Sequence, residues 1–192
     1  LKTINHTDDA FISQSVSESV AAIKKETSAS DAVAMQLLKA GLRENVSYLR
    51  MAQRYNEINK ALSEKLPLSG DRIAILAQIA IEHGAPSTQV VDLFVSLDKF
   101  TVFHRNGSIM SRDALMVLTE LCLERGLSAD AVSEQLEQIQ QRTQGKTRVT
   151  DAALASLTRT RFVNTQRHNA QAISERYLLI AQQAQTRQKG VP

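Results

Sequence analysis

Residues that interrupt helices are scarce in this chain of 192 residues. Proline occurs only at Pro67, Pro86 and Pro192, and there are seven glycines. Both residue types disfavour helix interiors, so long stretches without them predict a mainly α-helical fold. Hydrophobic residues make up 43% and charged residues 22%, which is ordinary for a globular protein.

The segment 31–66 is expected to form one long helix that is apolar on two sides. Its two apolar stripes advance by three and four residues, the rhythm of packed helices. One side can pack on the rest of the domain, and the other predicts a homodimer or a partner subunit. Asn45 interrupts one stripe and is interpreted as fixing the register; a long core helix in a monomer is the alternative. The residues assigned to the dimer or partner interface are Leu38, Leu42, Asn45, Tyr48, Leu49, Ala52 and Tyr55.

The remaining pattern predicts shorter helices and one strand-like segment. Helices are expected near 8–27, 70–83, 86–97, 111–125 and 128–142, with Ser111 and Ser128 as N-caps. Alternation over 100–104, followed by Asn106–Gly107, predicts a short β-hairpin. From residue 150 to about 189 one long basic helix is expected. These expectations divide the chain into a helical extension (1–30), a helical dimerising domain (31–142) and a basic tail (143–192).

Positive charge is concentrated at one end of the sequence. Residues 142–192 carry nine Lys and Arg but only Asp151 and Glu175 as acids, a net charge of +7. Such asymmetry indicates contact with a polyanion, although a solvated helix face is the alternative. Arg105 and Arg112 join the candidates because they flank the Asn106–Gly107 turn. The DNA-contact candidates are Arg105, Arg112, Lys146, Arg148, Arg159, Arg161 and Arg167.

The segment 118–136 has the spacing of a helix-turn-helix, with Gly126 in the turn and Ser128 as a cap. Its second helix, however, carries Asp130, Glu134 and Glu137, which DNA phosphates would repel. An ordinary helical hairpin is therefore the favoured interpretation of this segment.

No motif for catalysis, a cofactor or a metal stands out. The single cysteine, Cys122, lies on an apolar helix face, and the four histidines are scattered without the spacing of metal ligands. The chain is therefore not expected to be an enzyme or to bind zinc. No apolar run is long enough to cross a membrane, and the first residues do not resemble a signal peptide, so a cytoplasmic location is expected.

Residues 37–54 read LLKAGLRENVSYLRMAQR, with a leucine pair, then Ser-Tyr-Leu and Ala-Gln-Arg. This block resembles the opening helix of the FlhD family, the DNA-binding subunit of a flagellar master activator. The resemblance continues more weakly to about Thr119, under half of the chain, and favours a diverged relative such as those of conjugative elements. It implies a helical dimer that works with an FlhC-like subunit, which carries the zinc site in that family, to bind promoter DNA and recruit RNA polymerase. The residues that match are Leu37, Leu38, Lys39, Asn45, Ser47, Tyr48, Leu49, Ala52, Gln53 and Arg54.

Two functions follow as expectations. The first is a DNA-binding subunit of a transcriptional activator for flagellar or conjugative-transfer genes. The second is a helical protein–protein adaptor, or a secretion or assembly chaperone, without DNA contact. The positive charge of the tail favours the first, because an adaptor has no need to bind polyanions.

Overall fold

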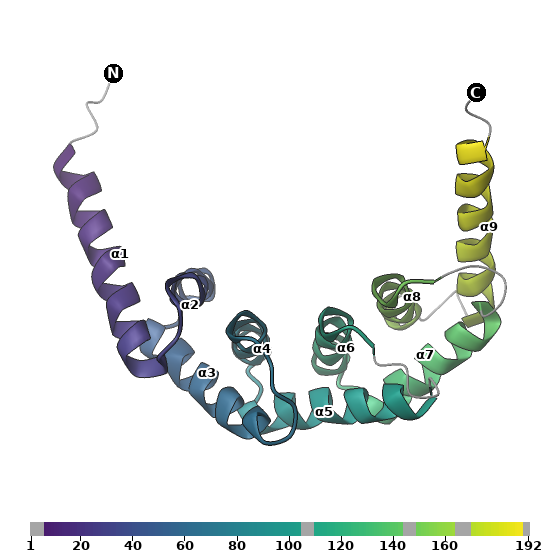
Figure 1. The fold of residues 1–192 in the computed structure, drawn as a ribbon, viewed down its shortest axis with the longest axis horizontal. Helices are drawn as coiled ribbons and strands as arrows, with labels where there is room; N and C mark the ends of the chain where they lie inside the picture. Colours follow the sequence, from purple (N-terminus) through teal and green to yellow (C-terminus); the bar gives the residue numbers. More distant parts are fainter. Residues whose placement is uncertain (1–5, 105–109, 144–148, 164–169, 190–192) are drawn as a thin grey trace. The chain divides into compact units, whose positions relative to one another are not determined.

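The computed structural model describes residues 6–104, 110–143, 149–163 and 170–189 (Figure 1). Within these ranges all regular structure is helical and there is no strand, so the prediction of a mainly α-helical fold is confirmed. The helices are α1 (His6–Thr27), α2 (Asp31–Arg43), α3 (Tyr48–Ser63), α4 (Gly70–Glu82), α5 (Ser87–His104), α6 (Arg112–Arg125), α7 (Ala129–Thr143), α8 (Asp151–Val163) and α9 (Ala170–Lys189).

The chain forms two compact units, residues 1–91 and 92–192, and the division falls within α5. In the first unit α2 packs beside α4 and α1 packs beside α3, which gives two layers of helices (Figure 1). In the second unit α6 packs beside α8, and α7 packs beside α9. The structure therefore divides the chain differently from the three predicted domains. The segment expected as an N-terminal extension is helix α1, which packs on α2 and α3.

The prediction of one helix over 31–66 is wrong, because the helix stops and restarts around Asn45. Asn45 adopts a left-handed conformation with φ of 53°, which asparagine tolerates better than most residues. The N–H of Val46 then reaches back to the carbonyl of Gly41 at 2.8 Å, closing α2 with a Schellman turn. Ser47 starts α3 by accepting the N–H of Arg50. Asn45 is thus a helix terminator, and its interpretation as a register-fixing residue in a continuous helix is wrong.

The same turn occurs three times, at Asn45, Gly84 and Gly126, about 40 residues apart. All three residues have positive φ, between 53° and 62°. In each turn the next N–H bonds the carbonyl five residues before it at 2.8 Å: Val46 to Gly41, Ala85 to Ala80 and Leu127 to Cys122. Each turn joins an even-numbered helix to the following odd-numbered one. The described chain therefore repeats one kind of helix–turn–helix connection, here called a hairpin, at a spacing typical of helical-repeat proteins.

The predicted β-hairpin is not supported. Residues 100–104, which alternate like a strand, form the last turn of α5, and residues 105–109 lie outside the described chain. Val90, Phe94 and Leu97 are buried at helical spacing. Five alternating residues are too few to outweigh that continuing helical pattern.

The long C-terminal helix is not supported either. Residues 150–189 contain two helices, α8 and α9, and residues 164–169 between them are not described. The two helices have different neighbours, since α8 packs against α6 whereas α9 packs mainly against α7. The expected N-caps in the second unit are confirmed: Ser111 accepts the N–H of Ala114, and Ser128 accepts the N–H of Ala131.

Candidate functional site

Only three of the seven predicted DNA-contact residues lie in the described part of the chain. Arg112 is on α6, and Arg159 and Arg161 are on α8. The other four, Arg105, Lys146, Arg148 and Arg167, fall outside the described residues, and the basic cluster they were expected to complete stays a prediction.

Arg112 and Arg159 already bind carboxylates of the same unit. Arg112, at the start of α6, forms an ion pair with Asp98. Arg159 reaches two carboxylates on successive turns of α6: its Nη1 lies 3.2 Å from Glu120 and its Nη2 lies 2.9 Å from Glu124. To contact a DNA phosphate, each guanidinium would have to exchange a charge-assisted hydrogen bond that it already makes.

Arg161 points away from Arg159, because residues two apart on a helix are separated by about 200° around its axis. Its Nε is buried and has no hydrogen-bond partner among the described atoms. Arg112 and Glu120, one of the two partners of Arg159, are separated by about 12 Å along α6. The three described arginines therefore do not form one cluster.

Helices α6 and α7 are joined by a short turn, which fits both the helical hairpin and the helix-turn-helix weighed from the sequence, so the preference for the hairpin stays a prediction. Gly126 closes α6 and Ser128 caps α7. Asp130 and Glu134 are exposed on α7. An acidic surface on the second helix is unsuited to a DNA groove, because phosphates repel carboxylates.

The predicted interface residues divide into buried and exposed sets. Leu38, Ala52 and Tyr55 are buried within the first unit and form part of its core. Leu42 and Leu49 are exposed, at 70% and 53%, on either side of the Asn45 turn. Asn45 is exposed too and Tyr48 is half-buried, so these four residues remain available to a partner or a second copy, and the predicted homodimer stays a prediction.

A polar cluster that sequence reasoning missed joins α3 to the start of α5. The hydroxyl of Ser87 donates to Glu57 Oε2 at 2.5 Å, and Arg54 Nη1 lies 3.0 Å from the same oxygen and 3.2 Å from the hydroxyl. The hydrogen bond from Ser87 lowers the pKa of Glu57 below its ordinary value. Ser87 is buried, so the cluster fixes the turn between α4 and α5 to α3. In the sequence, Pro86 and Ser87 indicate only the start of the helix expected near 86–97, not a polar cluster.

This cluster makes the stability of the first unit sensitive to acid. A carboxylate with a lowered folded-state pKa stabilises the fold above its unfolded-state pKa and loses that contribution as the pH falls through the folded-state value. We expect wild-type protein to lose more stability between pH ~5 and ~3 than Ser87→Ala, which lacks the hydrogen bond. Urea denaturation across this pH range measures the difference.

Ser69→Ala is the matched control, because Ser69 precedes α4 without making a side-chain cap. It should leave the pH dependence of wild type unchanged. Parallel pH profiles for wild type and Ser87→Ala would show that the Ser87–Glu57 hydrogen bond does not stabilise the folded protein.

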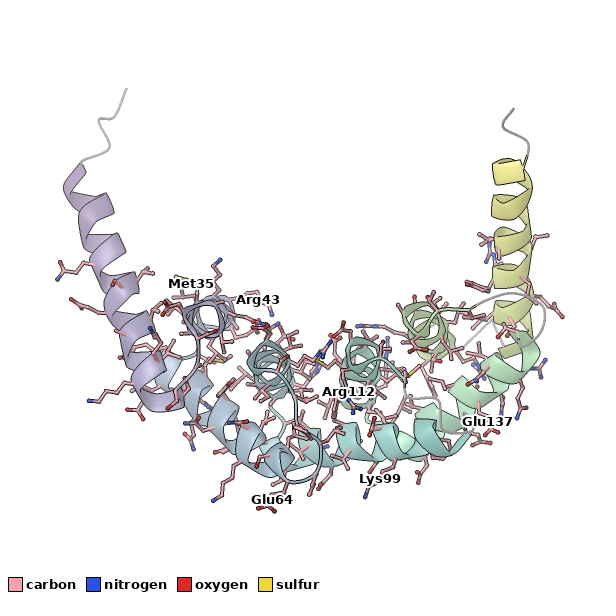
Figure 2. The ribbon with its side chains drawn as sticks, in the orientation of Figure 1. Met35, Arg43, Glu64, Lys99, Arg112 and Glu137 are labelled. Carbon is pink, nitrogen blue, oxygen red and sulfur yellow. The ribbon has the colours of Figure 1, made fainter. Side chains whose placement is uncertain are left out.

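The surface of the first unit carries shallow grooves along its helices. One groove of about 500 Å³ follows α2 and is walled by Gln78 of α4. Met35 and Arg43, two of its lining residues, both lie on the side of α2 away from α3 (Figure 2). A second groove of about 590 Å³ lies along α3 beside the Glu57–Ser87 cluster. It is lined by three basic and two acidic residues, so opposite charges alternate along it and largely offset one another.

Neither unit, within its described residues, brings three His, Cys, Asp or Glu side chains together as metal ligands. Cys122 is buried, as expected, and burial raises the pKa of its thiol to about 12. At neutral pH the thiol is protonated and acts as a small apolar side chain.

No described helix is long and apolar enough to cross a membrane. No protein-family model, no curated protein and no solved structure matches the chain, so its resemblance to FlhD stays a prediction.

Proposed function

We propose that this protein is a helical protein–protein adaptor, the second of the two functions expected from its sequence. The observation that carries the proposal is the series of helical hairpins joined by the same turn at Asn45, Gly84 and Gly126. Within each unit the packed helix pairs are one or two elements apart along the chain, and helical-repeat proteins built in this way bind other proteins through the surfaces of their helices.

Exposed large apolar side chains in both units support the proposal. Leu42 and Leu49 are exposed in the first unit, and Leu179 and Ile180 are exposed on α9 at 56% and 60%. Single exposed leucines are ordinary on a surface, but two large apolar residues in a row, such as Leu179 and Ile180, suit a contact with another protein.

A DNA-binding activator subunit that works with an FlhC-like partner is the second candidate. The net charge of +7 over residues 142–192 favours it. Against it stand the ion pairs of Arg112 and Arg159, which neutralise two of the cations available for phosphate contact. Under this proposal the partner subunit supplies any zinc site, and the complex recruits RNA polymerase to a promoter.

One experiment separates the two candidates. The chain is produced together with the product of the neighbouring gene and analysed by size exclusion with light scattering, with and without promoter DNA. The adaptor is expected to form a stable complex with a protein and to bind DNA no tighter than the ~1–100 µM of non-specific binding at physiological salt. The paired variants Leu42→Glu with Leu49→Glu, and Leu179→Glu with Ile180→Glu, should show which unit holds the partner.

Tight binding of promoter DNA over unrelated DNA would instead establish the activator. In that case Arg159→Gln combined with Arg161→Gln should flatten the dependence of log affinity on log salt by about two units of slope. Arg50→Gln, an exposed arginine of the first unit, is the control. An unchanged slope in the double variant would remove Arg159 and Arg161 from the DNA interface.

A further inference from the structure

The groove along α2 combines an apolar floor with a basic rim. The floor contains Met35 and Ala40, and Ala32 lies at one end. Lys39 and Arg43 stand on the rim, while Gln36 and Gln78 are its uncharged polar residues. No carboxylate lines the groove. Its lining residues on α2 advance by three and four positions, so they follow one face of the helix for about 16 Å.

The two rim cations differ in their ion pairs. Arg43 binds the carboxylates of Glu44 and Glu82. Lys39 is exposed, and none of the ion pairs found among the described residues involves it. Lys39 and Arg43 are four residues apart on one helix, a spacing at which like charges repel and destabilise the helix. The ion pairs of Arg43 already reduce that repulsion, so Lys39 is the rim cation that can gain a carboxylate from outside without displacing an existing ion pair.

Apolar side chains in the floor favour a partner that is itself amphipathic. Methionine is flexible and polarisable, so Met35 can adjust to the side chain that meets it. A groove between two helices accepts the apolar ridge of a third helix, with anchors spaced by three and four residues. Since the described fold has no strand edge, addition of a β-strand is not the mode this surface provides.

We propose that the groove formed by α2 and Gln78 of α4 binds an amphipathic helix of a partner protein that carries Asp or Glu along one edge. The apolar residues of that helix cover Met35 and Ala40, and its carboxylates face Lys39. This inference rests on the proposed adaptor function and names the surface and the chemistry of its partner.

Photo-cross-linking in the cells that make the protein tests the inference. Benzoyl-phenylalanine is placed at position 32, at the end of the groove, and in a matched variant at position 21, an exposed alanine of α1. The expected result is a cross-link from position 32 to a single partner peptide, identified by mass spectrometry as an amphipathic helix with acidic residues. Lys39→Glu in the same protein should lower the cross-link yield about tenfold, since it turns attraction into repulsion.

Three results would overturn the inference: no cross-link above the level at position 21, a partner peptide without acidic residues, or a yield that Lys39→Glu leaves unchanged. A cross-link to a second copy of this chain would overturn it as well. Thermal melting of Lys39→Glu verifies the fold, because an exposed lysine contributes little to stability. Benzoyl-phenylalanine at position 179 of α9 separates this inference from the adaptor function. A cross-linked protein there, with none at position 32, would leave the adaptor standing without this groove.

Discussion

Replacing Leu37 by alanine is expected to lower the free energy of unfolding by about 2–5 kcal/mol. Leu37 has no exposed surface in the core of the first unit, so the shorter side chain leaves a cavity that close-packed neighbours fill only in part. Urea denaturation followed by circular dichroism measures the change. The first unit should unfold at lower denaturant while the second keeps its transition.

Leu42→Ala is the matched control for Leu37→Ala, because both residues are leucines of α2. Leu42 is 70% exposed, and its loss should change stability by no more than about 0.5 kcal/mol. Equal losses for the two variants would mean that Leu42 is buried in solution, as it would be in the homodimer predicted from the sequence. The comparison therefore tests both the packing of α2 and the state of its exposed face.

The Gly41→Ala variant is expected to be less stable by about 1–3 kcal/mol, although alanine is normally the better helix former. A Cβ added at Gly41 would lie 2.8 Å from the carbonyl oxygen of Val46 and 3.2 Å from Met51. The Val46 oxygen cannot retreat easily, because the N–H of the same residue is hydrogen-bonded to Gly41. Thermal melting monitored at 222 nm is the simplest measurement.

Gly126→Ala shows what a glycine replacement costs without steric overlap. Gly126 has φ of 62°, and nothing lies within 4 Å of an added Cβ, so only the left-handed conformation is penalised, by about 1–2 kcal/mol. A Gly41→Ala protein that melts above wild type would show that the α2–α3 turn opens enough to admit a methyl group.

Helix identity and most helix ends were predictable because their signals are local. Scarce glycine and proline, together with the N-caps Ser111 and Ser128, located α6 and α7 correctly. Gly84 and Gly126 marked helix ends for the same reason, since a left-handed residue with no side chain is the usual terminator. Burial of Cys122 followed from the apolar face on which it lies.

The errors came from residues whose role depends on their neighbours in space. Asn45 interrupts an apolar stripe, and a polar residue there suits both a packed-helix seam and a left-handed turn. Comparison with Gly84 and Gly126 resolves the choice, since each of the three is followed by an apolar residue and then by serine or proline. Arg112 and Arg159 looked available for phosphate because their acidic partners, Asp98, Glu120 and Glu124, are 14 to 39 residues distant in sequence.

The hairpin turns also affect how the protein forms as it is synthesised. The helix pairs that pack within each unit are one or two elements apart, such as α1 with α2 and α3, so these native contacts connect segments that are close in sequence. Chains of low contact order fold fast, and folding during translation starts from the N-terminal end. The hairpin of α2 and α3 can therefore close on the ribosome before α6 has been made. At each stage of synthesis, the unfinished chain then exposes the apolar face of the last helix made, rather than all the apolar residues of the core.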